Sequence, residues 1–321
     1  MRAVRPDRAA DAVGPSYVAP FATSAALAGL APYLSRRLPA RPAAWSLVAG
    51  ALVAASGWIG GLALLAFTGL GQIRAVANQG PWSVWYLQTQ EPVSRIGAGV
   101  CGTVLLACAV LLARASWQRG RVLVHAHRQC RQLPAGGELA VVEDPVPDAF
   151  ALPGAPGRVV VSTGMLRAVS SVELEALLAH ERAHLHHRHH LFLLALRLAA
   201  AACPLLHPLA REGAFAIERW ADEEGARAVG DRTAMARALA RAALAGKRHG
   251  RATPLLGATG GPVPRRMRSL LSPLPRIRRT ALAAGIVLAV ACCLSLVLAA
   301  HTTEQLFETA MRVYVLRHPA H

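Results

Sequence analysis

Long stretches without a charged residue constrain this chain more than any other feature. Residues 44–70 read AWSLVAGALVAASGWIGGLALLAFTGL and are long enough to cross a bilayer, which takes about 20 apolar residues. Residues 96–113 and 281–300 are also free of charge and close to the minimum spanning length, whereas residues 17–35 are a weaker candidate interrupted by two prolines. The sequence therefore predicts about three transmembrane helices in its first part and one near its C-terminus.

The positive charge of the chain, formally +17, accompanies these apolar stretches. Arginines cluster in the loop 36–41 and directly after the third stretch, whereas the loop 71–95 carries few. The positive-inside rule then makes the loop 36–41 and residues 114–280 cytoplasmic and puts the loop 71–95 and both termini outside, although arginines near the N-terminus fit that side poorly. No nucleic-acid-binding module is recognisable. We therefore expect the lipid bilayer as a partner and no direct binding of nucleic acid.

The segment between the third and fourth apolar stretches is the one able to form a sizeable soluble domain. Its β-branched runs, bounded by proline and glycine, predict short strands. A helix is predicted to start at Ser170 or Ser171, either of which can cap it. No CxxC pair occurs, so the six cysteines indicate neither a disulfide framework nor a thiolate zinc site. The strands are expected within 138–145 and 158–163, and two further helices over about 209–229 and 233–246.

These patterns predict a multi-pass helical membrane protein of the α+β fold class. It is expected to carry one soluble domain between its third and fourth transmembrane helices. Residues 191–206 are short, contain an arginine and reach a proline, which favours a buried or membrane-skimming helix over a fifth span. The expected organisation is an N-terminal membrane region over 1–114 with helices at 17–35, 44–70 and 96–113, a soluble domain over 115–246, a basic connector over 247–280, a last transmembrane helix over 281–300 and a short tail over 301–321.

The residues His180-Glu181-Arg182-Ala183-His184 match the pattern H-E-x-x-H within the predicted helix. Two histidines four apart share one helix face, so both imidazoles can reach one ion while Glu181 lies beside it. The following helix carries Glu218 and Asp222, again four apart. One further helix and a turn separate it from the H-E-x-x-H helix. This separation allows the helix that carries Glu218 to fold back onto the H-E-x-x-H helix. The pattern predicts one Zn²⁺ per chain bound by His180, His184 and Glu218.

Three protein ligands leave one zinc position open for water, as a catalytic site requires. Zinc lowers the pKa of bound water toward about 7 and polarises a scissile carbonyl. Glu181 is then the general base, and Asp222 is expected to accept a hydrogen bond from the outer nitrogen of a ligand histidine. The competing interpretation is an exposed basic helix with incidental glutamates.

Four further histidines follow the motif at positions 186, 187, 189 and 190. At least two of them must face away from the ion, and we expect them to lie on a solvated or membrane-facing polar surface. His187 lies one turn after His184 and is the only one of the four that we consider as a neighbour of the ion.

With these residues assembled, the chain resembles the membrane-embedded zinc metallopeptidases of the BlaR/MecR antirepressor type, and more distantly the HtpX and Ste-type CAAX prenyl peptidases. The segments that carry the resemblance are DAFALPG (148–154), RVVVSTGMLRAVSSVELEALLAHERAHL (158–185) and ERWADEEGA (218–226). The resemblance implies a gluzincin-like domain with His180, His184 and Glu218 as zinc ligands, Glu181 as catalytic glutamate and Asp222 in support. It also implies that residues near 158–163 form the edge strand on which an extended substrate lies.

The chain departs from the antibiotic receptors in two respects. About twenty residues follow the last span where those receptors have a large penicillin-binding sensor, and Ala221 precedes Asp222 where they usually have cysteine. What carries over is the peptidase core, so the leading hypothesis is a cell-membrane zinc endopeptidase with a cytoplasmic active site that cleaves a protein substrate such as a transcriptional repressor. The alternative is a non-catalytic sensor or scaffold with a structural zinc site. A metal transporter is disfavoured because the histidines lie outside the predicted spans.

Overall fold

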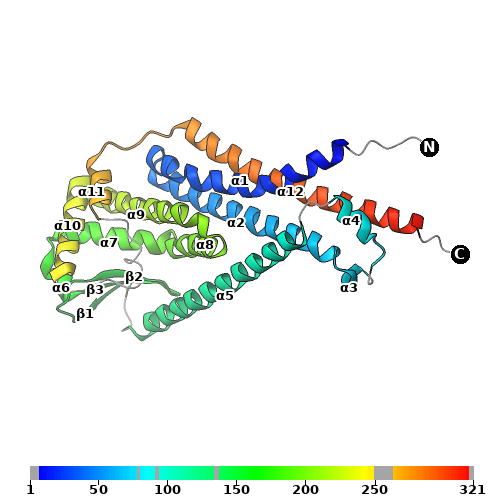
Figure 1. Cartoon of the computed structure of the whole chain (residues 1–321). Coiled ribbons are helices and arrows are strands. Elements are labelled where there is room, and N and C mark those ends of the chain that lie inside the picture. Colours follow the sequence, from blue (N-terminus) through cyan, green and yellow to red (C-terminus); the bar gives the residue numbers. More distant parts are fainter. Residues whose placement is uncertain (1–6, 78–79, 91–93, 134–136, 249–262, 318–321) are drawn as a thin grey trace.

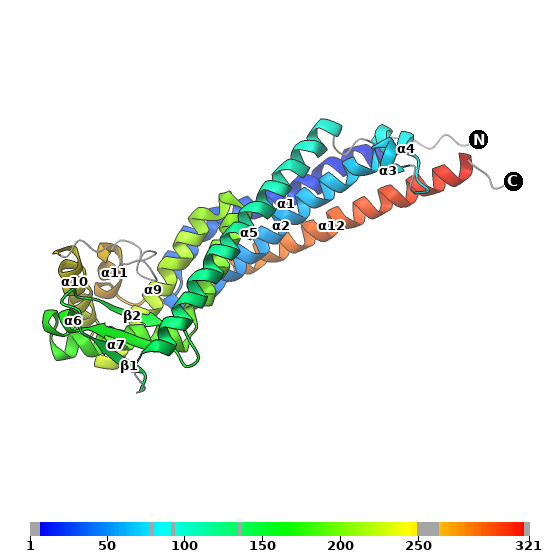
Figure 2. The ribbon, with the colours of Figure 1, turned by 90° about the horizontal axis from the view of Figure 1, so that it is seen from below.

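Four long helices dominate the computed structural model, which describes residues 7–77, 80–90, 94–133, 137–248 and 263–317. They run alongside one another in the bundle of Figure 2, and each is long and apolar enough to cross a membrane. The prolines of the first candidate span do not end its helix. The third span and the basic arm after it form one continuous helix. The four helices are α1 (Asp7–Arg37), α2 (Ala40–Gly71), α5 (Arg95–Gln132) and α12 (Arg279–Arg317).

Small residues let these helices approach closely. A Cβ added at Gly57 of α2 would lie 2.7 Å from Sγ of Cys292 in α12 and 3.0 Å from Oγ of Ser24 in α1. Close approach at small residues is the usual way in which apolar helices pack where no water drives them together. Two short helices, α3 (Arg74–Ala77) and α4 (Val84–Gln90), lie at the end of the bundle where both chain termini are found (Figure 1).

The rest of the described chain gathers at the opposite end of the bundle (Figure 1). There a small sheet and a group of helices surround the H-E-x-x-H helix. The helices are α6 (Thr163–Ala168), α7 (Ser171–His186), α8 (His189–Ala202), α9 (His207–Val229), α10 (Arg232–Arg248) and α11 (Val263–Leu271), with a 3₁₀ turn at Pro204–Leu206. Helix α8 has 14 residues, fewer than the about 20 that a membrane span takes, and its residues Leu193 and Leu196 share one apolar core with α2.

The three-stranded sheet corrects one expectation. Its order is β1-β3-β2, with β1 (Leu139–Val142) parallel and β2 (Ala149–Leu152) antiparallel to β3 (Arg158–Ser162). The resemblance implied that residues near 158–163 form the edge strand, but β3 is the central strand and is buried along its whole length. A strand flanked on both sides needs apolar residues throughout, which Val159, Val160 and Val161 supply. The edge next to the H-E-x-x-H helix is β2.

The segment expected as a basic connector, 247–280, contains a helix. Residues 249–262 lie outside the described part, and Val263–Leu271 form the helix α11. Its residue Leu270 packs in the same apolar core as Leu239 of α10 and Leu177 of α7. Residues 272–278 then lead directly into α12. Helix α11 therefore packs with the helices around the H-E-x-x-H motif.

Candidate metal centre

The H-E-x-x-H helix is held at its start by a capping box. The Ser170 hydroxyl accepts a hydrogen bond from the Glu173 backbone N–H, and the Glu173 carboxylate accepts one from the Ser170 backbone N–H. This pair satisfies two of the backbone donors that a helix start leaves without partners. Helix α7 packs against α9, and this contact brings the two halves of the candidate site together (Figure 1).

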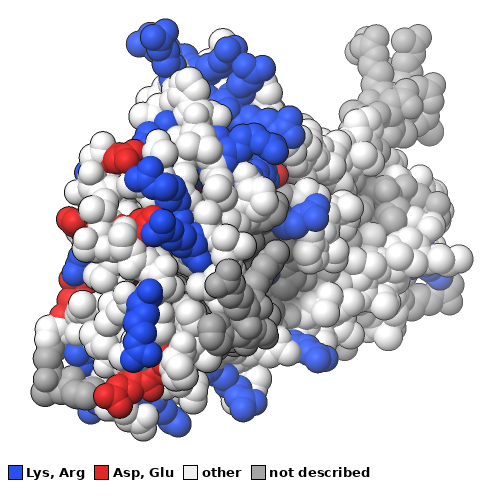
Figure 3. Space-filling model, turned by 90° about the vertical axis from the view of Figure 1, so that its left-hand side faces the viewer, with Lys and Arg blue, Asp and Glu red and all other residues white. Residues whose placement is uncertain are grey.

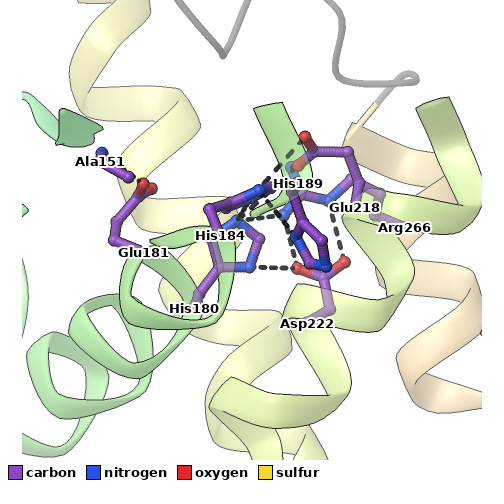
Figure 4. Close-up of polar contacts among 8 residues, drawn as sticks. All are labelled: Ala151, His180, Glu181, His184, His189, Glu218, Asp222 and Arg266. Atoms are coloured by element: carbon purple, nitrogen blue, oxygen red, sulfur yellow. Dashed lines mark hydrogen bonds and ion pairs between the residues drawn. The ribbon is translucent and has the colours of Figure 1, made fainter. Parts of the chain in front are cut away.

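His180 and His184 of α7 meet Glu218 of α9, as Figure 4 shows. The two Nε2 atoms lie 3.2 Å apart, and Glu218 carboxylate oxygens lie 3.7 Å from Nε2 of His180 and 3.9 Å from Nε2 of His184. One ligand atom from each residue lies within 4.8 Å of the other two, and all three side chains are buried. The three residues predicted as ligands are thus brought together at one point.

The donor set of these residues fits zinc. Two imidazole nitrogens and one carboxylate are the ligands of a catalytic zinc site, and three ligands leave a position free for water. Burial, together with the neighbouring His180, lowers the pKa of His184 well below its usual value. The ring is therefore neutral, which is the form that binds a metal ion.

The outer ring nitrogens of both histidines have neighbours. Nδ1 of His180 lies 3.1 Å from Oδ1 of Asp222, the contact that the sequence predicted for one ligand histidine. Nδ1 of His184 lies 3.0 Å from Nδ1 of His189. His187, the one of these four histidines considered as a neighbour of the ion, stacks on Trp220 with ring centroids 4.4 Å apart. Helix α7 ends at His186, so the helical spacing does not continue to the next turn.

Arg266 of α11 is a residue of the site that the sequence reasoning missed. Its guanidinium is buried and donates through Nε (2.9 Å) and Nη2 to the Asp222 carboxylate, while Nη1 lies 2.9 Å from Oε2 of Glu218. Nη2 is also 3.4 Å from Nε2 of His180. A fork of donors suits this task because it can hold two carboxylates in fixed positions. The signal was present in the sequence as apolar residues at helical spacing around it (Val263, Met267, Leu270).

Glu181 points from α7 toward the sheet (Figure 4). Its Oε2 accepts a hydrogen bond of 2.8 Å from the backbone N–H of Ala151 in β2. Burial raises the pKa of Glu181 to about 7, against the opposing effect of His180. A carboxyl group in this range can both take and return a proton near neutral pH, as a general acid–base must. Glu181 thus lies between the candidate metal ligands and the edge strand of the sheet.

Two histidines and a glutamate with an adjacent carboxyl group are the residue types found in metal-dependent hydrolase sites. Comparison with protein families agrees: residues 117–216 match the model of peptidase family M48, which supports a metallopeptidase of this family in the broad sense. The matched segment contains the H-E-x-x-H helix but ends before Glu218, so the third ligand, Asp222 and Arg266 rest on the geometry alone. No curated protein and no solved structure matched the chain.

Proposed function

We propose that this chain is an integral membrane zinc endopeptidase of the BlaR/MecR-like type, with its active site in the cytoplasm and a protein as its substrate. The observation that carries the proposal is the convergence of His180, His184 and Glu218 from two helices, with Glu181 beside them. A bound zinc ion would lower the pKa of its water and polarise the scissile carbonyl. Glu181 takes the proton of the attacking water and returns it to the leaving amine.

The edge strand β2 offers a place for the substrate backbone. Ser162 N–H donates to the carbonyl of Asp148 across the β2–β3 pair. Because hydrogen-bonded and non-bonded pairs alternate, the backbone groups of Ala149 and Ala151 point away from β3. That edge lies next to Glu181, whose carboxylate accepts the Ala151 N–H. An extended peptide that pairs with β2 would therefore be held beside the general base.

The proposal is tested with purified full-length protein in detergent. Wild-type protein should hold about one zinc per chain, and Glu181→Gln should keep the zinc while it loses proteolysis of fluorescent casein by about 10²-fold or more. The matched control is Glu175→Gln, an exposed glutamate on the same helix, which should retain activity. If wild-type and Glu181→Gln proteins behave alike in every proteolysis assay, the chain is a non-catalytic sensor or scaffold with a structural zinc site.

The substrate can be sought in cells with the same variant. A strain that carries Glu181→Gln should accumulate one or a few uncleaved proteins that the wild-type strain processes, and comparison of the two proteomes would detect them. A transcriptional repressor among these proteins would support a regulatory protease. Identical proteomes would count against a cellular peptidase role.

A further inference from the structure

His189 is placed at the site by an unusual backbone conformation. Helix α7 ends at His186 and α8 begins at His189, and Arg188 between them has φ 52° and ψ 42°, in the left-handed region. Residues other than glycine rarely adopt this region. The sharp change of direction returns the chain toward the site, so His189 has no exposed surface whereas His186 is exposed. Its ring centroid lies 4.8 Å from that of His184 and 4.7 Å from that of Trp220.

The contact between His184 and His189 has a definite direction once the proposed ligands are considered. A neutral imidazole carries one N–H, and a ring that binds metal through Nε2 must carry its hydrogen on Nδ1. His184 directs Nε2 toward Nε2 of His180 and the Glu218 carboxylate, so its Nδ1 is the outer atom. The 3.0 Å contact of that Nδ1 is with Nδ1 of His189. His184 therefore donates, and His189 accepts.

We propose that His189 is a positioning residue whose Nδ1 accepts the Nδ1–H of His184 and thereby keeps Nε2 of His184 directed at the metal. This inference rests on the proposed zinc site. Asp222 lies in the corresponding place for His180, with its Oδ1 3.1 Å from Nδ1. Such outer hydrogen bonds fix the tautomer and the orientation of a ligand ring, and their loss typically lowers metal affinity by about 10- to 100-fold.

His189 is a support and not a further ligand. The described donors that lie within reach of one another are those of His180, His184 and Glu218, without His189. When Nδ1 of His189 accepts from His184, its own hydrogen lies on Nε2, and that atom is buried with no hydrogen-bond partner among the described residues.

Zinc affinity of the full-length protein in detergent tests the inference, measured by competition with a chromophoric chelator. In His189→Phe the ring remains but the acceptor is lost, and we expect zinc affinity to fall by about 10- to 100-fold. In His189→Asn an amide oxygen can occupy the place of Nδ1, and we expect most of the affinity to return. His186→Phe is the matched control on the exposed side of the same run and should bind zinc as the wild type does.

The outcomes separate the two proposals. If wild-type protein fails to bind zinc, the proposed function and the role of His189 both fail. If wild-type and His189→Phe proteins bind zinc equally well, or if Asn and Phe weaken binding equally, only the role of His189 is overturned. Should His189→Phe not fold, the zinc-loaded wild type labelled with ¹⁵N-histidine decides: a neutral His189 with its hydrogen on Nε2 supports the inference, and a hydrogen on Nδ1 overturns it.

Discussion

Arg266 contributes the positive charge that lets two carboxylates lie side by side in a buried site. Burial alone would raise the pKa of Asp222, but the Arg266 guanidinium lowers it to about 2. Asp222 is therefore ionised at neutral pH and can accept from His180. The same guanidinium lies 2.9 Å from the Glu218 carboxylate. A single side chain from α11 thus orients both a proposed ligand and the support of another ligand.

Replacement of Arg266 should be costly. Arg266→Met leaves two buried carboxylates without a cation, and removal of one partner from such a group typically costs about 3–5 kcal/mol of folding free energy. Arg266→Lys restores the charge but not the planar group of N–H donors that contacts both carboxylates, so it should recover only part of the lost stability. Thermal unfolding and zinc content of the purified variants measure both effects.

The neighbouring Arg265 provides the control, because its ion pair with Glu212 is partly exposed. Arg265→Met should cost no more than about 1 kcal/mol, as for other pairs near the surface. Equal effects at positions 265 and 266 would contradict the role assigned to Arg266.

The residues of the site differ in how far the sequence alone could predict them. His180, Glu181 and His184 follow from one local spacing, and Glu218 and Asp222 from another, because residues four apart on a helix share a face. Arg266 lies in a run of arginines that is typical of a membrane-flanking segment, which hid its burial. His189 lies five residues after His184 and reaches it only through the left-handed conformation of Arg188, where no glycine indicates a turn.

At the scale of the element, the capping box of α7 supports the helix that carries the proposed ligands. The Glu173 carboxylate accepts from Ser170 and also pairs with Arg241 of α10 at 2.7 Å. Burial alone would raise the pKa of Glu173, but the hydrogen bonds from Ser170 and the charge of Arg241 outweigh it and leave the pKa below the usual value of 4.5. The start of α7 is therefore tied to α10 by an ionised group.

This arrangement predicts a pH-dependent contribution to stability. A carboxyl group with a lowered pKa in the folded state stabilises the fold above its unfolded pKa, and the contribution is lost as the pH falls through the folded value. The stability of wild-type protein should therefore exceed that of Glu173→Gln at pH 7, and the difference should shrink as the pH falls below 4.5. Unfolding curves of both proteins across this range measure it, and a constant difference would refute the ionic contribution.

Ser170→Ala should cost about 1 kcal/mol at either pH through loss of the cap.

Element types could be predicted from local patterns, but their order in space could not. The strand over 158–162 and the helices that carry the motifs lie close to their predicted ranges. Strand order depends on contacts between segments that are distant in the sequence. The expectation that residues near 158–163 form the edge strand was therefore wrong, and β3 is the central strand. One sequence signal did point to it: RVVVS contains three consecutive valines, and a continuous apolar run is typical of a strand covered on both sides.

For the molecule as a whole, the structure separates two ends. The short link between α1 and α2 lies at one end together with the sheet and the helices around the H-E-x-x-H motif, and α3, α4, the start of α1 and the end of α12 lie at the other (Figures 1 and 2). These relative sides agree with the arrangement expected from the arginine distribution. Viewed from its outer end, the part of the molecule around the H-E-x-x-H helix shows many basic side chains with fewer acidic ones (Figure 3). A basic face of this kind suits the cytoplasmic side of a membrane, where anionic lipids gather.

Cysteine labelling in intact cells tests the proposed orientation. Thr89→Cys lies at the end with the termini and Glu175→Cys in the soluble domain, and both positions are exposed. A membrane-impermeant maleimide should label the first in intact cells and the second only after permeabilisation. The unmodified chain, with its own six cysteines, gives the background. Labelling of Glu175→Cys in intact cells would contradict the proposed orientation, because this position would then lie outside the cell.

The third proposed ligand stands on a helix that the membrane region helps to enclose. Ala216, Ile217 and Trp220 of α9 share one apolar core with Leu34 of α1 and Leu47 of α2. The Arg219 guanidinium also donates to the carbonyl of Ser35 at 2.7 Å. A fragment trimmed to the soluble part would leave this face of α9 bare in water, one helical turn from Glu218. Expression of an isolated fragment is thus a poor route to testing the proposed enzyme, and reconstitution of the intact polypeptide in lipid is the sound one.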